Sequence, residues 1–416
     1  MAGASARLGG ILRLLTLLGG LGAVFAAGAL LHPQFLTIAN QRDVLAQVSV
    51  NGILAVGMTL VILAGGIDLS VGSVMSLCTV VCAILLMERG ATESARRAEV
   101  MVLVGIGALA LAVAGPWLSR LWAAGRRRLA LLLGVAAVGI TAMLVHLAGA
   151  AVGRGYSALG VLLAVPVVGG LLGLVNGVIV ARTRLQPFIV TLAMMVSAVG
   201  LAKYIAGNGG QIHAIYTGDE QTRGAPAAFE ELGATILTVG RERLPSGRVQ
   251  DLKLLPVPGL FLLGAWSAAA FLLHKLPLGR YIYAVGGNAE AARLAGVPVA
   301  NVRVFVYTAS GVLAGLAAVL YCAQYTQGKA DAGQGKELDA IAAVVIGGTS
   351  LMGGRGSILG TLVGVLIFGY LTNILQLRAV SSEIQDILKG VIIVGAAVVQ
   401  SGGLLSGVRR LVGPRE

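Results

Sequence analysis

The sequence predicts an all-α polytopic membrane protein with about 10–12 transmembrane helices. Of its 416 residues, 57% are hydrophobic and only 12% are charged, whereas soluble domains average about 25% charged residues. Apolar runs recur along the chain, and most reach the roughly 18–25 residues with which a helix crosses a bilayer. The 61 glycines suit helices that approach one another closely in lipid.

Twelve hydrophobic segments form the predicted spans. Each is expected to be helical, because a chain in hydrocarbon must satisfy its own backbone hydrogen bonds. The tenth is short and ends in glycines, which leaves a half-span or a re-entrant segment open. The segments are residues 11–31, 44–64, 70–87, 100–118, 129–149, 156–181, 188–206, 259–275, 303–323, 338–352, 356–377 and 386–403.

Positive charge in alternate loops gives the predicted orientation, because arginine and lysine accumulate in cytoplasmic loops. With the N-terminus inside, every strongly basic loop is cytoplasmic, and so are both termini. The basic, apolar N-terminus also fits a cleavable signal peptide, but its apolar run continues through Leu31 without a clear cleavage site, which favours a retained span. The net charge of +13 therefore reflects topology, and no nucleic-acid partner is expected. The basic cytoplasmic residues are Arg7, Arg13, Arg120, Arg126, Arg127, Arg128, Arg182, Arg184, Lys275, Arg280, Arg293, Arg355, Arg409 and Arg410.

We expect one transmembrane domain over residues 1–416, in which three regions stand out. Residues 88–155 contain an extra hydrophobic hairpin that resembles an insertion. Residues 207–258 are polar and rich in proline and glycine, which predicts an ordered external loop with a short helix over Ala227–Leu232. This loop is either a docking surface or simply a solvated connection. Residues 276–302 form a cytoplasmic loop between two spans.

A short, well-capped helix is predicted inside the cytoplasmic loop, within residues 278–298. Asn288 suits its N-cap, because the asparagine side chain accepts a hydrogen bond from an unpaired backbone N–H. Glu290 lies in the first turn, where negative charge suits the helix dipole, and Arg293 three residues on can pair with it. Gly296 favours the left-handed conformation that ends a helix. A helix of about two turns is marginal alone in water, which suggests that another protein holds it.

Two glycine-rich motifs indicate a possible internal repeat. Gly65–Ser73 reads GGIDLSVGS and Gly347–Ser357 reads GGTSLMGGRGS. Each follows one apolar segment and precedes another in the same predicted orientation, as in a parallel repeat; chance similarity is the alternative. Their glycines can break a helix and expose backbone groups, which is tolerated at membrane depth only in a protein interior or a wet cavity.

Asp68, in the first motif, is the acid closest to the apolar segments of the first half of the chain. An ionisable group near a span indicates a functional site by default. The alternative is that Asp68 and Ser70 only cap the span that begins at residue 70. The second motif has no acid, which favours a structural role for the residues that the two motifs share.

The chain carries no recognisable energy source for transport. It has no G-x-x-x-x-G-K-[ST] phosphate-binding loop, so we do not expect it to hydrolyse ATP. No proton relay of acids and histidines is visible in its spans, and its four His and three Cys are too scattered for a metal site. The interpretations left open are a pore subunit driven by a separate motor, a self-contained carrier, and a non-transporting scaffold.

Distinctive sequence occurs in three blocks: GILAVGMTLVILAGGIDLSVGS (Gly52–Ser73), LGRYIYAVGGNAEAARLAGV (Leu278–Val297) and ELDAIAAVVIGGTSLMGGRGSILGTLVGVLIFG (Glu337–Gly369). Weaker support comes from QPFIVTLAMM (Gln186–Met195) and LKGVIIVGAAVV (Leu388–Val399). With these blocks, the chain resembles the membrane-spanning permease subunits of bacterial ABC sugar importers of the ribose/xylose/arabinose type. The resemblance touches most of the chain except 88–155 and 207–258.

The resemblance implies that the cytoplasmic loop inserts into a groove of a partner ATP-binding subunit and couples it to the pore. It implies no cofactor on this chain, since ATP and Mg are held by the partner subunits. Its other implied partners are a second permease copy in a homodimer, an extracytoplasmic sugar-binding protein and membrane lipid. The implied coupling residues are Gly286, Gly287, Asn288, Glu290, Ala291, Ala292, Arg293 and Gly296. The residues implied to lie beside the translocation pathway are Gly65, Gly66, Asp68, Ser70, Gly72, Gly347, Gly348, Thr349 and Ser350.

The resemblance also implies a multi-pass protein of the bacterial inner, or plasma, membrane that imports a monosaccharide. Typical members of the family have fewer spans than the twelve segments counted in this chain. The extra length of 88–155 most resembles the longer xylose permeases, so we expect a pentose such as D-xylose. Arabinose, galactose and inositol stay open as substrates.

Overall fold

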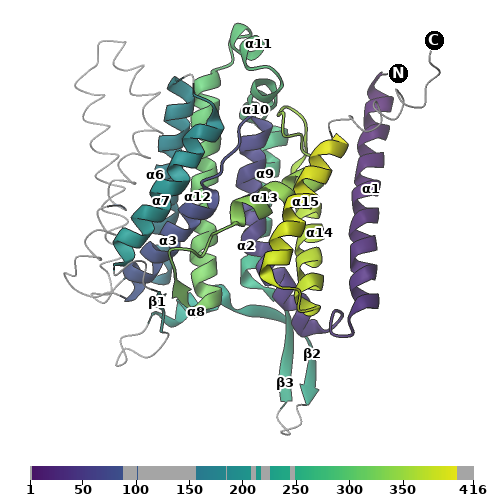
Figure 1. Ribbon diagram of the computed structural model, residues 1–416, viewed down its shortest axis with the longest axis vertical. Coiled ribbons are helices and arrows are strands. Elements are labelled where there is room, and N and C mark those ends of the chain that lie inside the picture. Colours follow the sequence, from purple (N-terminus) through teal and green to yellow (C-terminus); the bar gives the residue numbers. More distant parts are fainter. Residues whose placement is uncertain are drawn as a thin grey trace. The chain divides into compact units, whose positions relative to one another are not determined.

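The computed structural model describes residues 2–87, 101, 156–183, 185–207, 212–216, 225–243 and 249–400. Helices dominate this part of the chain (Figure 1). The predicted inserted hairpin of 88–155 lies outside the described residues apart from Met101.

A described helix lies at each predicted span outside 88–155, but some ends differ: α1 and α2 begin at Ala2 and Ile38, where residues 11 and 44 were predicted. Among the described helices, α13 has 11 residues, about half the length that a span requires, so the short tenth segment is a half-length helix. The helices are α1 (Ala2–Leu31), α2 (Ile38–Leu63), α3 (Val71–Met87), α6 (Ala158–Arg182), α7 (Pro187–Ala206), α9 (Val257–Lys275), α12 (Val299–Tyr325), α13 (Lys336–Ile346), α14 (Ile358–Leu377) and α15 (Ser382–Gln400).

Six of the described helices are long and apolar enough to cross a membrane: α2, α6, α7, α9, α12 and α14. Leu15–Leu31 within α1 and Val71–Met87 are shorter apolar helices. Length and hydropathy therefore confirm the prediction of an all-α polytopic membrane fold.

The chain divides into two compact units. The first comprises Met1–Ile67, Thr235–Val299 and Leu338–Glu416, and the second comprises Asp68–Ala234 and Ala300–Glu337. The chain passes from the first unit to the second inside the glycine motif that begins at Gly65. The two halves of this motif therefore belong to different units.

Helix α2 is the centre of the first unit, and almost all of its second half is buried. Helices α9 and α14 pack against it. Helix α14 runs antiparallel to α2, because Asn373 near the end of α14 meets Asn40 at the start of α2. Their side-chain amides exchange two hydrogen bonds: Nδ2 of Asn40 donates to Oδ1 of Asn373 at 3.0 Å, and Nδ2 of Asn373 donates to Oδ1 of Asn40 at 2.8 Å. At the opposite ends, the hydroxyls of Thr361 and Thr59 are 2.8 Å apart. These two polar pairs, one part-buried and one buried, fix the register of two largely apolar helices.

Helix α3 is the centre of the second unit, where every residue from Val71 to Leu86 is buried. Helices α6 and α7 pack against α3. Helices α6 and α12 meet through glycines, since a methyl group on Gly311 would overlap the backbone of Gly169, and one on Gly173 would overlap the backbone of Tyr307. Small residues four apart on α6 therefore let the two backbones approach closely.

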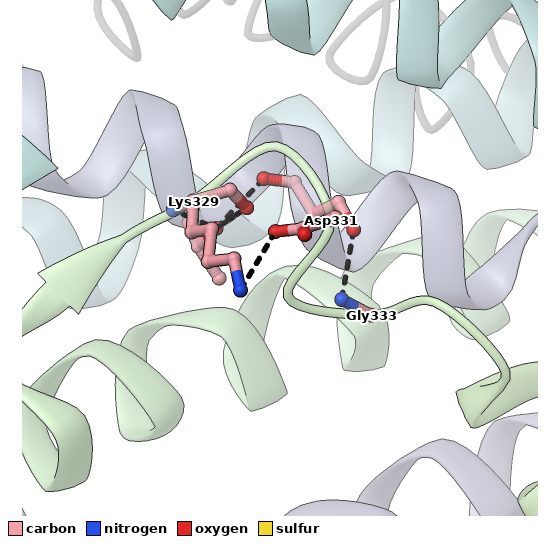
Figure 2. A network of polar contacts seen from close by, with 5 residues as sticks. Lys329, Asp331 and Gly333 are labelled. Atoms are coloured by element: carbon pink, nitrogen blue, oxygen red, sulfur yellow. Dashed lines mark hydrogen bonds and ion pairs between the residues drawn. The ribbon is translucent and has the colours of Figure 1, made fainter. Parts of the chain in front are cut away.

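The connection between α12 and α13 folds back along α3. The N–H of Gly333 donates to Oγ of Ser76 at 2.8 Å, and that of Lys329 donates to Oγ1 of Thr79 at 3.2 Å. Figure 2 shows the turn of this connection, where Nζ of Lys329 lies 3.2 Å from a carboxylate oxygen of Asp331. Side chains of α3 thus satisfy non-helical backbone inside a helical unit.

Residues 207–258 were predicted to form an ordered loop with a short helix, and the structure adds a β-hairpin to that helix. Helix α8 (Ala227–Gly233) matches the predicted one, but an antiparallel hairpin of β2 (Thr235–Arg243) and β3 (Val249–Pro256) follows it. Figure 1 shows the hairpin at the end of α9 opposite α10 (Pro277–Gly287) and α11 (Ala289–Leu294). The β-branched residues of β2 and the sequence Pro245–Gly247 are strand and turn signals, which a search for apolar runs does not register. Two short strands, β1 (His213–Ala214) and β4 (Gln327–Gly328), also pair.

Candidate functional site

The helix predicted within residues 278–298 is present as α11 (Ala289–Leu294). Oδ1 of Asn288 accepts hydrogen bonds from the N–H groups of Glu290 at 3.0 Å and Ala291 at 2.9 Å. Gly296 has a φ of 81°, which places it in the left-handed region that ends helices. The predicted N-cap and helix end are both confirmed.

An ion pair joins Glu290 and Arg293 on the surface of α11, as their spacing predicted. Both side chains are mostly exposed, at 65% and 68%, and the paired carboxylate raises the pKa of Arg293 above its usual value. Exposed pairs of this kind contribute little to folding stability. The pair therefore leaves both charges on a surface where a partner can bind them.

Two of the three alanines of α11, Ala291 and Ala292, differ in burial, and a leucine ends the helix. Ala292 is buried against its own unit, whereas Ala291 is exposed. Leu294, which was not among the predicted coupling residues, is 81% exposed. A large apolar side chain in a helix that otherwise consists of alanine and charged residues is the sequence signal that would have identified it.

A longer helix, α10 (Pro277–Gly287), precedes α11 and was not predicted as a separate element. It buries Ile282 and Val285 and contacts α9 and α2. Gly286 and Gly287, both predicted as coupling residues, form its last turn. A methyl group on Gly287 would meet no atom within 4 Å, but one on Gly286 would overlap the carbonyl oxygen of Leu63 and lie 2.6 Å from N of Gly354.

Gly65, Gly286, Gly353 and Gly354 form a junction that we call the glycine junction. A methyl group on Gly353 would lie 2.7 Å from Cα of Gly65, so the backbones touch directly. The N–H of Gly354 also donates to the carbonyl oxygen of Leu63 at 3.0 Å. The left-handed φ values of Gly65, Gly353 and Gly354, 78°, 83° and 68°, require glycine on steric grounds. The junction joins α10 to the end of α2 and to the loop before α14.

The second glycine motif, Gly347–Ser357, forms a loop between α13 and α14. Its predicted pathway residues Gly347, Gly348, Thr349 and Ser350 form the first part of this loop. Gly347 is buried against the backbone of Gly360 in α14, and Gly348 has a φ of 83°. The Thr349 side chain is buried, and its hydroxyl has no hydrogen-bond partner among the described residues. The N–H of Ser350 donates to the carbonyl oxygen of Arg355 at 2.8 Å, which closes the tip of the loop.

Asp68, Ser70, Asn176 and Ser310 form a buried polar cluster in the second unit. Oδ1 of Asp68 accepts from N of Ser70 at 3.0 Å and from its Oγ at 2.6 Å, and Oδ2 accepts from Oγ of Ser310 at 3.0 Å. Nδ2 of Asn176 donates to Oγ of Ser70 at 2.9 Å. Each of the four side chains is at most 2% exposed. The cluster links the start of α3 to α6 and α12.

The predicted pathway residues of the first motif therefore lie in two places, at the end of α2 and in the second unit. Gly65 and Gly66 belong to the end of α2, where N of Gly66 donates to the carbonyl oxygen of Val61 at 3.0 Å. Asp68 and Ser70 belong to the buried polar cluster, and the backbone of Gly72 packs against Gly333. Asp68 holds Ser70, the residue just before α3, and contacts Ser310 directly and Asn176 through Ser70. Its roles as a cap and beside the pathway both stay predictions.

Asn176 and Ser310 were missed as candidates, although Asn176 stands in an otherwise apolar run, a signal that was available. Oδ1 of Asn176 is buried with no hydrogen-bond partner among the described residues. Within the described part of the chain, no group of His, Cys, Asp and Glu is arranged to hold a metal ion. The three cysteines, Cys78, Cys82 and Cys322, are buried.

Residues 129–397 match the family described as branched-chain amino acid transport system / permease component. The ribose import permease protein RbsC of Escherichia coli K12 is 37% identical over 375 residues, which cover 89% of this chain and 88% of that protein. The chain belongs to the ABC importer permeases of the ribose and xylose type. This permease is also 32% identical to RbsC of Bacillus subtilis over 89% of its own length and 87% of the relative's. It is 31% identical to the xylose transport system permease protein XylH of E. coli K12, over 88% and 86%.

No solved structure matches this permease significantly. Its relatives are permease components of ABC import systems, so ATP hydrolysis lies in separate subunits, and import needs ATP-binding and substrate-binding partners. With its apolar helices, the permease is a multi-pass protein of the inner membrane.

Proposed function

We propose that this permease translocates a pentose into the cytoplasm through a pore formed with a second copy of the chain. The observation that carries the substrate class is the set of relatives, named for ribose at 37% and 32% identity and for xylose at 31%. Both sugars are uncharged pentoses. A weakly polar, uncharged pathway for such a substrate agrees with a chain of which only 12% is charged.

The choice between the two pentoses rests on opposing observations. The extra hydrophobic hairpin of 88–155 favoured xylose at the sequence level. The higher identity to ribose permeases, 37% against 31% for xylose, favours ribose. The proposal is therefore made for a pentose, with ribose and D-xylose as the sugars to compare first.

The proposed orientation places α10 and α11 in the cytoplasm. Lys275, Arg280 and Arg355 are exposed near this end of the first unit, and basic residues accumulate on the cytoplasmic side. Helix α9, with 19 residues, is long enough to place the β2–β3 hairpin on the external side. Both chain termini are then cytoplasmic. An external sugar-binding protein would dock at the side of the hairpin, and lipid would surround the spans.

ATP and Mg are proposed to bind the partner subunits, with no cofactor on this chain. The closing ATP-binding subunits would pull on α11 and switch the pore from inward-facing to outward-facing. The glycine junction fixes α10 to the first unit, and the chain continues from α11 into α12, which belongs to the second unit from Ala300 onward. A displacement of α11 would therefore act on the first unit through α10 and on the second unit through α12.

Reconstitution tests this proposal against the alternative of a self-contained sugar carrier. Proteoliposomes holding the permease with its ATP-binding subunits should import a radiolabelled pentose when ATP is inside and the binding protein is outside. The purified permease alone should import none. Uptake by the permease alone would overturn the proposal and establish the carrier instead.

A sugar panel tests the substrate class in the same proteoliposomes. ATPase activity should rise most when the binding protein is loaded with ribose or D-xylose, because a loaded binding protein reports that the pore can accept its sugar. Arabinose, galactose and inositol are the comparison ligands. Stimulation by galactose or inositol alone would show that the pentose assignment is wrong.

Charge reversal on α11 tests its docking. Glu290→Lys or Arg293→Glu should leave membrane insertion and thermal stability unchanged, because the pair is exposed, but should weaken co-purification of the ATP-binding subunits. The matched control is Asp43→Lys in the exposed pair of Arg42 and Asp43 on α2. The double variant Glu290→Arg/Arg293→Glu restores the internal pair. Recovery of binding in that variant would mean that the pair only stabilises α11, and unchanged binding in the single variants would argue against docking.

A further inference from the structure

Two large apolar side chains are almost fully exposed at the proposed cytoplasmic end of the first unit. Met352 is 86% exposed and Leu294 is 81% exposed, and among the described large hydrophobic residues only Leu30 of α1 exceeds them, at 88%. Leu294 ends α11, whereas Met352 lies at the tip of the loop between α13 and α14. The exposed fraction of Met352 in the loop is therefore similar to that of Leu294 in α11.

The tip that presents Met352 is held by its own hydrogen bonds. Its ends are joined from N of Ser350 to O of Arg355 at 2.8 Å. Inside the tip, N of Gly353 donates to O of Ser350 at 3.0 Å, and N of Met352 donates to Oγ of Ser350 at 3.3 Å. An apolar side chain held outward on an ordered turn is preorganised for a contact, because little conformational freedom is left to lose on binding.

The same loop is attached to α10. Gly353 and Gly354 belong to the glycine junction, and Oη of Tyr283 in α10 donates to O of Gly356 at 3.1 Å. Both anchors lie within the first unit. The Met352 tip therefore moves with α10, and a protein that binds α11 approaches the unit from the same end.

We propose that the tip Ser350–Arg355 is a second docking element for the ATP-binding subunit, with Met352 as its central contact. This inference rests on the proposed function, because it takes α11 as the first docking element. Methionine and arginine are enriched at protein interfaces, and the flexible thioether adapts to the pocket it enters. Arg355 beside Met352 is exposed, so the pocket for the tip should carry acidic residues at its rim. Two attachment points on one unit resist rotation of the subunit about α11, which a single six-residue helix does not.

Thiol protection tests the contact directly. The three native cysteines are 0% exposed, so a cysteine introduced on the surface is labelled selectively by a maleimide polymer without prior removal of the native ones. We compare Met352→Cys, Leu294→Cys and, as the external control, Tyr216→Cys, whose native side chain is 69% exposed. Each is labelled in lipid nanodiscs, first with the permease alone and then after ATP-binding subunits are added.

The expected result is ready labelling of all three variants in the permease alone, and loss of most labelling at Met352→Cys and Leu294→Cys once the ATP-binding subunits are bound. Tyr216→Cys should stay labelled. Labelling that persists at Met352→Cys while Leu294→Cys is protected would overturn the second element and leave docking of α11 intact. Persistence at both positions in an assembled complex would instead refute the proposed docking itself. Protection of Met352→Cys in the permease alone would show that lipid or the second copy covers the tip.

Substitution gives the energetic counterpart. Met352→Glu should weaken association of the ATP-binding subunit, and Met352→Leu should retain it, because leucine keeps the apolar contact. The exposed position makes both variants compatible with folding. Equal association of both variants with the ATP-binding subunit would contradict the proposal.

Discussion

Gly286→Ala should lower the thermal stability of this permease sharply, whereas Gly287→Ala, one residue along the same helix, should not. A methyl group on Gly286 would overlap the carbonyl oxygen of Leu63 and lie 2.6 Å from N of Gly354. Backbone atoms cannot rotate away as a side chain does, so α10 or the end of α2 must shift. Overpacking of this kind typically costs about 1–3 kcal/mol even where side chains can yield.

The matched control, Gly287→Ala, separates the effect of the steric overlap on stability from the effect of helix propensity. Both glycines lie in the last turn of α10, so alanine improves helix propensity about equally at either position. A methyl group on Gly287 meets no atom within 4 Å. The measurement is the melting temperature of each purified variant in detergent, with monodispersity by size-exclusion chromatography. Equal melting temperatures for the two variants would mean that the glycine junction is not tightly packed.

The same pair of variants also reports on coupling. If Gly286→Ala folds in part, its ATPase activity with partner subunits should become less dependent on the loaded binding protein, because α10 is no longer seated on α2. This expectation depends on the proposed docking of α11, whereas the loss of stability does not. The two readouts therefore separate the packing claim from the functional one.

The contrast between Asn288 and Gly286 shows what local sequence can predict. The N-cap at Asn288, the pair of Glu290 with Arg293 and the ending at Gly296 depend on residues within one turn, so their spacing in the sequence was sufficient. Gly286 contacts Leu63 and Gly354, which are far away along the chain. Its assignment to the exposed coupling surface could not include this packing, because helix spacing says nothing about the opposite backbone.

The spans were predictable for a different reason. Lipid requires long apolar helices, and the sequence shows them as uninterrupted runs. The β2–β3 hairpin lies outside those runs, so a search for apolar segments passed over the β-branched residues of β2 and the turn signal of Pro245–Gly247. The exposure of Met352 was also hidden, since apolar residues near spans are normally expected in lipid or in the core.

Asp68→Ala should destabilise the second unit more than any other single removal of a carboxylate among the described acids. It leaves the N–H and hydroxyl of Ser70 and the hydroxyl of Ser310 without their acceptor in a site that is at most 2% exposed. Each buried group left unsatisfied costs about 1–3 kcal/mol. The control is Asp331→Ala in the same unit, whose carboxylate is 51% exposed and pairs with Lys329 at the turn. Its melting temperature should stay close to that of the native permease.

Asp68→Asn separates the structural from the pathway interpretation, because it preserves shape and removes charge. The amide oxygen can still accept both bonds from Ser70, and the amide nitrogen can donate to Ser310, whose hydroxyl is free to turn. Assembly and melting temperature should therefore stay near the native values, while sugar uptake in the reconstituted importer should fall. A parallel loss of assembly and uptake would make Asp68 a structural cap for α3. The cluster of Asp68, Ser70, Ser310 and Asn176 would then serve only to hold three helices together, and the pathway would have to be sought among other polar groups.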